Sequence, residues 1–314
     1  SWILAASSAC ILPGDIPWAL RPAWAAETVR RSMEDRFRQA LPMEEAALLT
    51  GLVMGYRSPM DRGLTRAIQD AGVMHLLVPS GAKVAFVWLS AVGLGLALGL
   101  PPGARFGAAA LVAGFYTLMV GGDAPYARAF LGAVILAGGR LLGRESGGFQ
   151  ALVLSAALLL IVEPRELFGA GFQMTYLAVG GLVLVMPSVS AALPRGWPRW
   201  ARHGLQLGAV GAVVQLMLWP TFAAYFGRGS LIGPLANMLL VPYSGVLMAG
   251  GFSLWAGGAL PEPVPGLLAA VVAEALRWFR EACLFFAAVP GAAVDAAPFS
   301  PWGLAAYYLA AFAV

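Results

Sequence analysis

The stretch Asp70–Val84, which reads DAGVMHLLVPSGAKV, divides this sequence into two unlike parts. It sets His75, Ser80 and Lys83 among apolar residues, and a proline and two glycines interrupt it. The chain after this stretch is a succession of apolar segments, whereas the chain before it is polar enough to lie in water or on a membrane surface. A bent polar segment at the edge of a hydrophobic bundle indicates a path for a polar molecule.

Composition places the chain in the class of integral membrane proteins. Of its 314 residues, 60% are apolar and only 11% are charged, whereas a soluble domain has about 25% charged residues. The apolar runs are continuous instead of alternating, which indicates membrane-spanning helices and not a barrel. We therefore expect an all-α, polytopic bundle of transmembrane helices.

Several kinds of chemistry are excluded by what the sequence lacks. Its two cysteines, Cys10 and Cys283, lie far apart in apolar segments, and two histidines are too few for a metal cluster. There is no Walker-type phosphate loop, no GxGxxG after a strand and no metal-binding string of His and Asp. We expect no metal, no cofactor and no catalysis here. The first residues, without an initiator Met or a basic leader, suggest a piece of a longer protein.

Residues 1–72 are expected to form amphipathic helices that lie in the membrane interface on the extracytoplasmic side. Apolar residues recur every four positions over 29–41, and charged residues occupy the other faces. A second helix is predicted to open at Pro42. Ser58 is the predicted cap of a third helix, with Gly72 as its stop.

Residues 73–314 are expected to form the transmembrane channel domain. Several of its apolar segments are short for a hydrocarbon core about 30 Å thick, which takes about 20 helical residues. We therefore expect some helices to be broken, tilted or re-entrant, and the sequence shows no internal repeat. The predicted spans are 84–100, 106–121, 125–142, 149–162, 167–187, 204–226, 231–258, 264–290 and 302–314.

Basic residues in alternate loops predict the orientation of these spans, because short cytoplasmic loops are enriched in Lys and Arg. The loops between them are neutral or acidic overall, as over 163–166. The N-terminal helices then lie outside; their own arginines argue against this orientation but are balanced by nearby acids. The arginines expected in the cytoplasm are Arg105, Arg140, Arg144, Arg195, Arg199 and Arg202.

The few polar residues near the apolar spans each allow a structural and a functional interpretation. Lys83 either extends to lipid headgroups or lines a polar path. His75 is either a hydrogen-bonded structural residue or part of the same path. Ser80 could simply satisfy backbone groups freed at the break in the chain. Arg128 either pairs with Asp123 or faces an anion.

Amide side chains within the spans allow the same two interpretations. Gln173, Gln215 and Asn237 either form hydrogen bonds across helices or face a wet cavity. Asn237 differs from the others because Pro234 and Pro242 flank it and predict a broken helix. Irregular backbone at that depth is tolerated only where it is buried in protein or lines a wet cavity.

The polar clusters follow one another in a distinctive order. His75-Leu76-Leu77 with Ser80-Gly81 and Gly171-Phe172-Gln173 are the more specific pieces. The others are a Gly-x-x-Pro-x-x-Arg-Ala turn from Gly122 to Ala129, Arg144, Glu163-Pro164, and the residues Pro234, Asn237 and Pro242. This order resembles the membrane competence domain of the ComEC family of DNA-uptake proteins, from about Trp24 to about Met248.

The resemblance implies a multi-pass channel that carries one strand of transforming DNA across the bacterial cytoplasmic membrane. It also implies an extracellular DNA receptor and a cytosolic ATP-driven motor as partners. Family members often add an OB-like domain and a metallo-β-lactamase-like nuclease domain, and we expect neither in this chain. The family usually has His where this chain has Lys83. A role specific to imidazole is therefore not carried over, whereas a permanent positive charge suits phosphate.

We therefore expect a conduit for single-stranded DNA that binds phosphates strongly enough for entry and weakly enough for exit. Aromatic residues such as Tyr225 either stack with bases or pack against protein and lipid. A small-solute transporter with broken helices and an intramembrane hydrolase using Ser80 and His75 are the alternatives. The predicted lining residues are His75, Ser80, Lys83, Tyr126, Arg128, Gln173 and Asn237.

Overall fold

The described part of the chain, residues 17–312 without 56–59, 144–146 and 195, is built almost wholly from α-helices in this computed structural model. Its elements in chain order are η2 (Trp18–Leu20), α2 (Arg21–Ala40), α3 (Met43–Met54), α4 (Arg62–Asp70), η3 (Met74–Leu76), α5 (Gly81–Ala97), α6 (Pro102–Met119), α7 (Ala124–Leu141), α8 (Gly148–Val162), η4 (Pro164–Phe168), α9 (Ala170–Leu184), α10 (Met186–Ala192), α11 (Arg199–Phe226), β1 (Arg228–Ser230), α12 (Gly233–Gly257), α13 (Val264–Ala287), β2 (Ala293–Asp295) and α14 (Pro301–Phe312).

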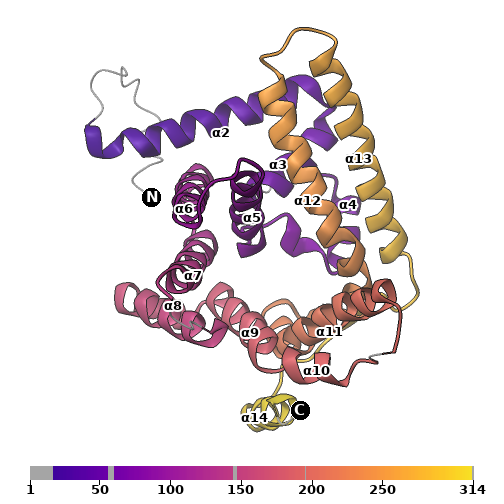
Figure 1. The fold of residues 1–314 in the computed structure, drawn as a ribbon. Helices are drawn as coiled ribbons and strands as arrows, with labels where there is room; N and C mark the ends of the chain where they lie inside the picture. The colour runs from indigo at the N-terminus through magenta and orange to yellow at the C-terminus, as the bar shows by residue number, and fades with distance from the viewer. Residues whose placement is uncertain (1–16, 56–59, 144–146, 195, 313–314) are drawn as a thin grey trace.

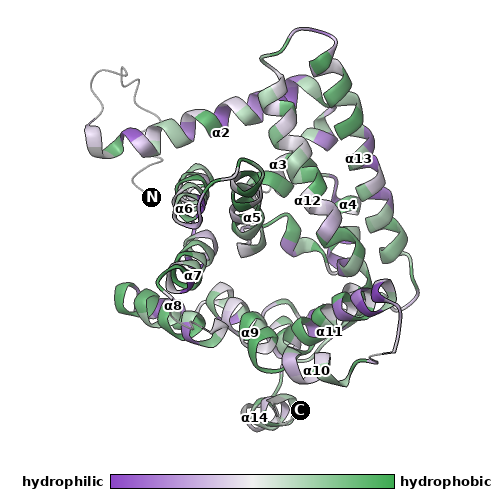
Figure 2. Cartoon of the chain, in the orientation of Figure 1, coloured by the Kyte–Doolittle hydropathy of each residue, from purple (hydrophilic) through white to green (hydrophobic). Residues whose placement is uncertain are grey.

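The helices form a ring, with α5 to α9, α11, α12 and α4 arranged around a central gap (Figure 1). Helix α2 extends from this ring on one side, and α14 lies against its outside. Hydrophobic residues dominate α5 to α9, whereas hydrophilic and hydrophobic residues alternate along α2 (Figure 2). Each predicted span overlaps at least one of the observed helices from α5 to α14.

Three helical stretches among the described residues are long and apolar enough to cross a membrane, namely Ala170–Ala192, Arg199–Phe226 and Gly233–Gly257. Two shorter apolar helices, Gly81–Ala97 and Gly148–Val162, accompany them. The prediction of an all-α membrane protein is therefore confirmed. The position of the N-terminal helices in a membrane interface stays a prediction.

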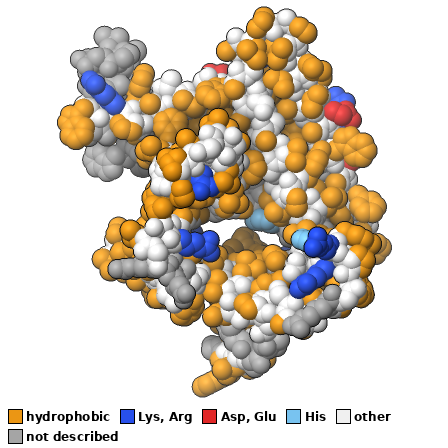
Figure 3. All heavy atoms as spheres, viewed as in Figure 1, with side chains coloured by type: hydrophobic (Ala, Val, Ile, Leu, Met, Phe, Trp, Pro, Cys, Tyr) orange, Lys and Arg blue, Asp and Glu red, His pale blue; other side chains and the backbone are white. Residues whose placement is uncertain are grey.

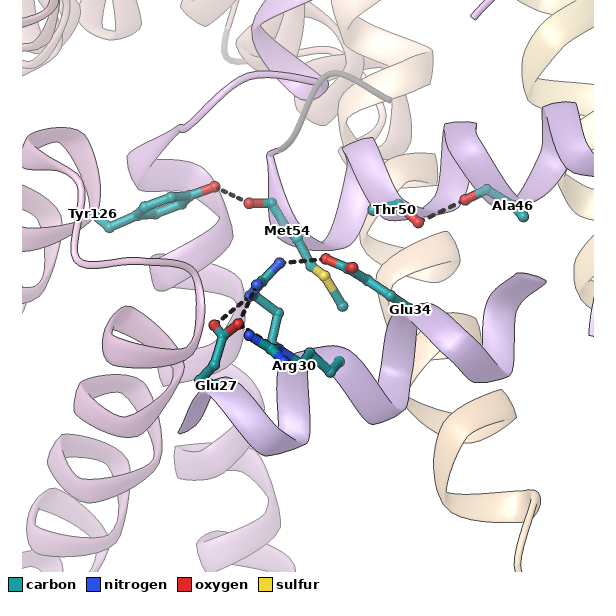
Figure 4. Close-up of polar contacts among 8 residues, drawn as sticks. Glu27, Arg30, Glu34, Ala46, Thr50, Met54 and Tyr126 are labelled. Carbon is teal, nitrogen blue, oxygen red and sulfur yellow. Dashed lines mark hydrogen bonds and ion pairs between the residues drawn. The ribbon is translucent and has the colours of Figure 1, made fainter. Parts of the chain in front are cut away.

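Helix α2 is amphipathic, as its sequence pattern predicts. Met33 and Phe37 are buried on its inner face. On its other side Arg30 donates hydrogen bonds to Glu27 (Nε to Oε2, 2.8 Å) and to Glu34 (2.6 Å), as Figure 4 shows. The hydrogen bond from Arg30 lowers the pKa of the Glu27 carboxyl below its usual value.

Helix α3 lies inside the bundle and not on its surface. Every residue from Ala46 to Met54 is buried. Pro42 precedes its first turn, where Glu44 and Glu45 face the positive end of the helix dipole. The polar start of this helix therefore belongs to its exposed amino end, and its Ala- and Leu-rich remainder forms part of the core that the later helices share.

Helix α4 begins at Arg62, and its cap is Asp61, whose carboxylate accepts the Leu64 N–H at 3.0 Å. The predicted cap, Ser58, lies outside the described residues. The predicted stop is confirmed, since Gly72 follows the helix with φ of 75°.

Gly72 also allows a close approach between distant segments. A Cβ at this position would lie 2.8 Å from the Cβ of Ser230 and 3.0 Å from the Cα of Gly233. Ser230 donates a hydrogen bond to the Asp70 carbonyl at 2.7 Å, and Arg228 forms an ion pair with the Asp70 carboxylate at 3.2 Å. The antiparallel pair of β1 and β2 is thereby fixed to the end of α4.

Helix α11 contains Pro220 in its interior, and α14 repairs the resulting defect. Proline has no N–H, so the Leu216 carbonyl loses its helical donor. The hydroxyl of Tyr307 donates to this carbonyl at 2.7 Å, and the hydroxyl of Tyr308 donates to that of Met217 at 3.0 Å. A segment 91 residues away thus satisfies the backbone at the proline.

Helix α12 runs without interruption from Gly233 to Gly257, so the break predicted around Asn237 is wrong. Pro234 lies in the first turn, where the missing N–H costs nothing. Pro242 lies within the helix and is accommodated there. Asn237 is therefore a side chain on a continuous helix.

Candidate functional site

The carboxyl end of α3 is the buried centre of the candidate site. The last carbonyl groups of a helix have no partner within the helix, and here side chains from three later helices supply donors. Lys83 Nζ donates to Gly51 at 2.8 Å, the Tyr116 hydroxyl to Val53 at 2.5 Å and the Tyr126 hydroxyl to Met54 at 2.8 Å. We call these three donors the α3 cap.

Lys83 is enclosed by protein, with only 4% of its surface exposed. Its ammonium group also donates to the Val78 carbonyl at 3.1 Å. A cation at this position is stabilised by the negative end of the α3 dipole and by two carbonyl oxygens. The geometry therefore favours a structural role for this lysine, through the backbone and not through lipid headgroups.

The two tyrosines of the α3 cap pack edge to face, with ring centroids 6.1 Å apart. Tyr126 is fully buried, and Figure 4 shows its hydroxyl directed at the end of α3. Gly55, which directly follows α3, has φ of 76°, and a Cβ there would overlap the Tyr126 hydroxyl. A residue with a side chain does not fit at this junction.

Ser80 and His75 lie on the segment that leads into α5. Ser80 is the N-cap of α5, and its Oγ accepts the Ala82 N–H at 3.3 Å. His75 is exposed, yet desolvation by surrounding protein lowers the pKa of its imidazole, which is therefore neutral near pH 7.

Arg128 pairs with Glu166 at 2.8 Å and not with Asp123, so that expected ion pair is wrong. The two partners lie 38 residues apart in the chain, on α7 and η4. The Arg128 side chain is 2% exposed, whereas that of Glu166 is 32% exposed. Arg128 thus attaches the η4 turn to the start of α7.

Gln173 joins a second polar group close to the same turn. Its Nε2 donates to the Leu167 carbonyl at 3.2 Å, and its Oε1 accepts the Tyr225 hydroxyl at 3.2 Å. Tyr225 also lies 3.3 Å from the Phe168 carbonyl. These contacts connect η4, α9 and the end of α11.

Asn237 and Gln215 face the region where α11 and α12 meet. The Oδ1 of Asn237 and the Nε2 of Gln215 are buried and have no hydrogen-bond partner among the described residues. A Cβ on Gly233, one turn before Asn237, would lie 3.4 Å from the Gln215 Oε1. Gln215 therefore lies against the first turn of α12, and each of the two amides has one buried polar atom without a partner among the described residues.

The structure brings the predicted lining residues into separate groups, and α7 connects two of them. Tyr126, with Lys83, holds the end of α3, while Arg128, two residues further along α7, holds η4. Gln173 lies on the α9 side of that turn, and Asn237 lies on α12. The sequence analysis missed Glu166 and Tyr116, which are the partners of these groups, because their contacts are distant in the chain.

A hollow opens at the centre of the ring, between the surfaces of α5, α7, α9 and α11 (Figure 3). Lys and Arg side chains gather around it on the face shown, over α6, α7 and the start of α11. Arg144 and Arg195 lie outside the described residues. The arginines at these helix ends are Arg105, Arg140, Arg199 and Arg202.

No three His, Cys, Asp or Glu side chains of the described residues come together in a group that could hold a metal ion. Cys283 is buried as a free thiol in α13, and Cys10 lies outside the described residues. The site is therefore made of cations, hydroxyls, amides and backbone groups. Such groups suit the binding and release of a polar or anionic molecule.

Residues 52–314 match the Competence protein family, so the chain belongs to that family. The resemblance seen in its motifs is thereby confirmed. Membership supports a role in DNA uptake at the level of the family, together with a place in a membrane.

Two curated proteins illustrate the relationship. The chain is 27% identical over 206 residues to ComE operon protein 3 of Bacillus subtilis, a match covering 65% of this chain and 25% of that protein. It is 24% identical over 208 residues to the uncharacterized protein YcaI of Escherichia coli, covering 62% and 27% respectively. The chain thus corresponds to about a quarter of each relative. No solved structure matches it.

Proposed function

We propose that this chain forms a conduit that passes single-stranded DNA across the bacterial cytoplasmic membrane during natural competence. The observation that carries the proposal is the hollow within the ring of helices, bordered on one face by arginines (Figure 3). A nucleic-acid path needs cations at its mouth to attract phosphates. It also needs a lumen that does not retain the strand.

The residues divide into two roles in this proposal. His75 is exposed, and Asn237 has an unsatisfied amide oxygen. Gln173 is half-buried and hydrogen-bonded to Leu167 and Tyr225. In this proposal all three residues would face the strand. Ser80, Lys83 and Tyr126 would hold the wall in position, because their polar atoms are engaged with the backbone. Arg128 would hold the η4 turn through the bond from its Nη1 to Glu166. A neutral imidazole and amides would contact bases and sugars without trapping the phosphates.

The proposed partners follow from the same function. The lipid bilayer surrounds the apolar outer face of the ring, where large hydrophobic side chains such as Leu111 and Ile161 are exposed. A DNA receptor would deliver the strand from outside, and an ATP-driven motor would draw it into the cytoplasm. In this scheme the basic face is the cytoplasmic one, as the distribution of arginines predicts.

Cysteine accessibility tests the proposal in the full-length protein in its native membrane. His75→Cys, Gln173→Cys and Asn237→Cys are labelled with a membrane-impermeant thiol reagent, after replacement of Cys10 by Ser. Leu111→Cys is the control, since this side chain is exposed on α6 and is expected to face lipid. The buried Cys283 gives no signal. We expect labelling at the three positions and protection by oligodeoxythymidylate.

Two results would contradict this function. Labelling that matches the Leu111→Cys background at all three positions would mean that no aqueous lumen reaches them. Protection by small solutes but not by the oligonucleotide would assign the hollow to a small-solute transporter.

A further inference from the structure

Arg128 and the amino end of α9 together form a site with the properties of an anion-binding site. The Arg128 side chain is 2% exposed, and its Nε is buried without a hydrogen-bond partner among the described residues. Its Nη2 lies against Gly171, where a Cβ would be only 3.1 Å away. Gly171 is the second residue of α9, so the guanidinium adjoins the start of that helix.

The start of α9 adds its own positive potential. The first N–H groups of a helix have no acceptors within it, and the aligned peptide dipoles favour an anion there. The N-cap of α9 is Gly169, which has no side chain that could satisfy these donors. Backbone donors at a helix start combined with an arginine are a recurrent way to bind phosphate.

Glu166 supplies the anion in the structure as it stands. Its carboxylate meets Arg128 Nη1 at 2.8 Å and comes from the η4 turn that directly precedes α9. The two partners differ in exposure: the Glu166 side chain is 32% exposed and borders water, whereas the Arg128 side chain is 2% exposed and is enclosed by protein. A buried guanidinium left without an anion is costly, so Glu166 can leave only when another anion replaces it.

We propose that Glu166 is an internal substitute for phosphate, and that the phosphodiester backbone of DNA displaces it from Arg128 at the start of α9. This inference rests on the proposed function, which supplies the strand. A competitor that is part of the chain reduces the apparent affinity for each phosphate, because only the fraction of molecules with Glu166 displaced can bind. Each phosphate would then bind transiently and be released when Glu166 returns, as conduction requires.

The test compares Glu166→Gln with Glu163→Gln, a matched control on the same segment. Glu163 is exposed and forms no ion pair with a described residue. Removing the competing charge at Glu166 should lower the dissociation constant for oligodeoxythymidylate about tenfold, whereas the control should equal the parent. An oligonucleotide with an uncharged methylphosphonate backbone should show no such gain. Adding Arg128→Gln to Glu166→Gln should abolish it.

Inorganic phosphate tests the anion site independently of DNA transport. Phosphate binds only the folded site, so it should raise the melting temperature of Glu166→Gln more than that of Glu163→Gln or of the Arg128→Gln double variant. Equal shifts in all variants, or equal oligonucleotide affinity of Glu166→Gln and Glu163→Gln, would overturn the inference. If phosphate selectively stabilises Glu166→Gln but no variant binds oligonucleotide, the anion site stands and the DNA function falls.

Discussion

At Gly55, we expect a single added carbon to lower the stability of the protein strongly. It has φ of 76°, and a Cβ would overlap the Tyr126 hydroxyl that caps α3. We expect Gly55→Ala to lower the free energy of unfolding by about 1 kcal/mol for the backbone conformation. Loss of the hydrogen bond to Met54 should add about 1–3 kcal/mol. Thermal unfolding of the purified protein in detergent measures the sum.

Gly122 provides the control for this substitution. It has a similar φ of 67°, but a Cβ there would meet nothing within 4 Å. Gly122→Ala should therefore carry the backbone cost alone. Equal losses in the two variants would show that Tyr126 does not hold the end of α3 as described.

Arg128 shows which ion pairs can be predicted from the sequence and which cannot. An arginine in an apolar span must find an anionic or polar partner, and the sequence offered Asp123 five positions before it. Asp123, however, lies just before the helix start, and the partner is Glu166 on a turn 38 residues later. Local spacing predicts pairs within one helix, whereas the pairing of two loops is set by the fold.

At the scale of elements, the contact between α11 and α14 leads to a prediction that a double-mutant cycle can test. Tyr307 donates to the Leu216 carbonyl because Pro220 does not. Tyr307→Phe should cost about 1–3 kcal/mol in the parent, since it leaves that carbonyl unsatisfied. In the Pro220→Ala background the restored N–H can serve Leu216, so the cost should be smaller. Unfolding of the four variants in detergent measures the coupling.

Tyr243→Phe is the matched control for this cycle. Its hydroxyl donates to the Ala275 carbonyl at 3.0 Å, between α12 and α13, away from Pro220. The cost of Tyr243→Phe should be the same with and without Pro220→Ala. If Tyr307→Phe behaves in the same way, then α14 does not repair the proline defect.

The positions of the helices in the sequence were the most predictable feature of this structure. Apolar runs in a membrane protein are bounded by polar loops, so the predicted spans overlap the observed helices from α5 onwards. One prediction was wrong at this level, and one feature was not predicted. Prolines were read as a break in α12, but one lies in its first turn. The burial of α3 was not foreseen, because charges at its amino end concealed a wholly buried remainder.

At the scale of the whole molecule, the basic face predicts which ends of the helices share a compartment. Arg140 ends α7 and His203 lies in the first turns of α11, while Asp123 and Phe226 lie at the opposite ends of these helices. Cysteines at Arg140 and His203 should react only from the cytoplasm, and cysteines at Asp123 and Phe226 only from outside. Impermeant thiol labelling of intact and inverted vesicles checks this orientation.

The two cysteine positions on one helix serve as controls for each other. Both variants of a pair report on the insertion of the same helix, so they should differ only in the side from which they are labelled. Positions 203 and 226 are about 35 Å apart along a helix rising 1.5 Å per residue, enough to cross the hydrocarbon core. Labelling of both members of a pair from one side would contradict the proposed crossing. The ring itself could not be predicted from the sequence, since apolar runs do not reveal which helices are neighbours.

The α3 cap has a consequence for how the protein is made. Helix α3 leaves the ribosome before α5, α6 and α7, and the donors for its last carbonyls belong to residues synthesised about 30 to 70 positions later. Until α5, α6 and α7 have entered the membrane, the side-chain donors are missing, and of these carbonyls only that of Gly51 has a local partner among the described residues, the Gly55 N–H. The other carbonyls must remain in contact with water or with the insertion machinery. Final docking of α3 is therefore a late event of biogenesis, although its sequence comes early.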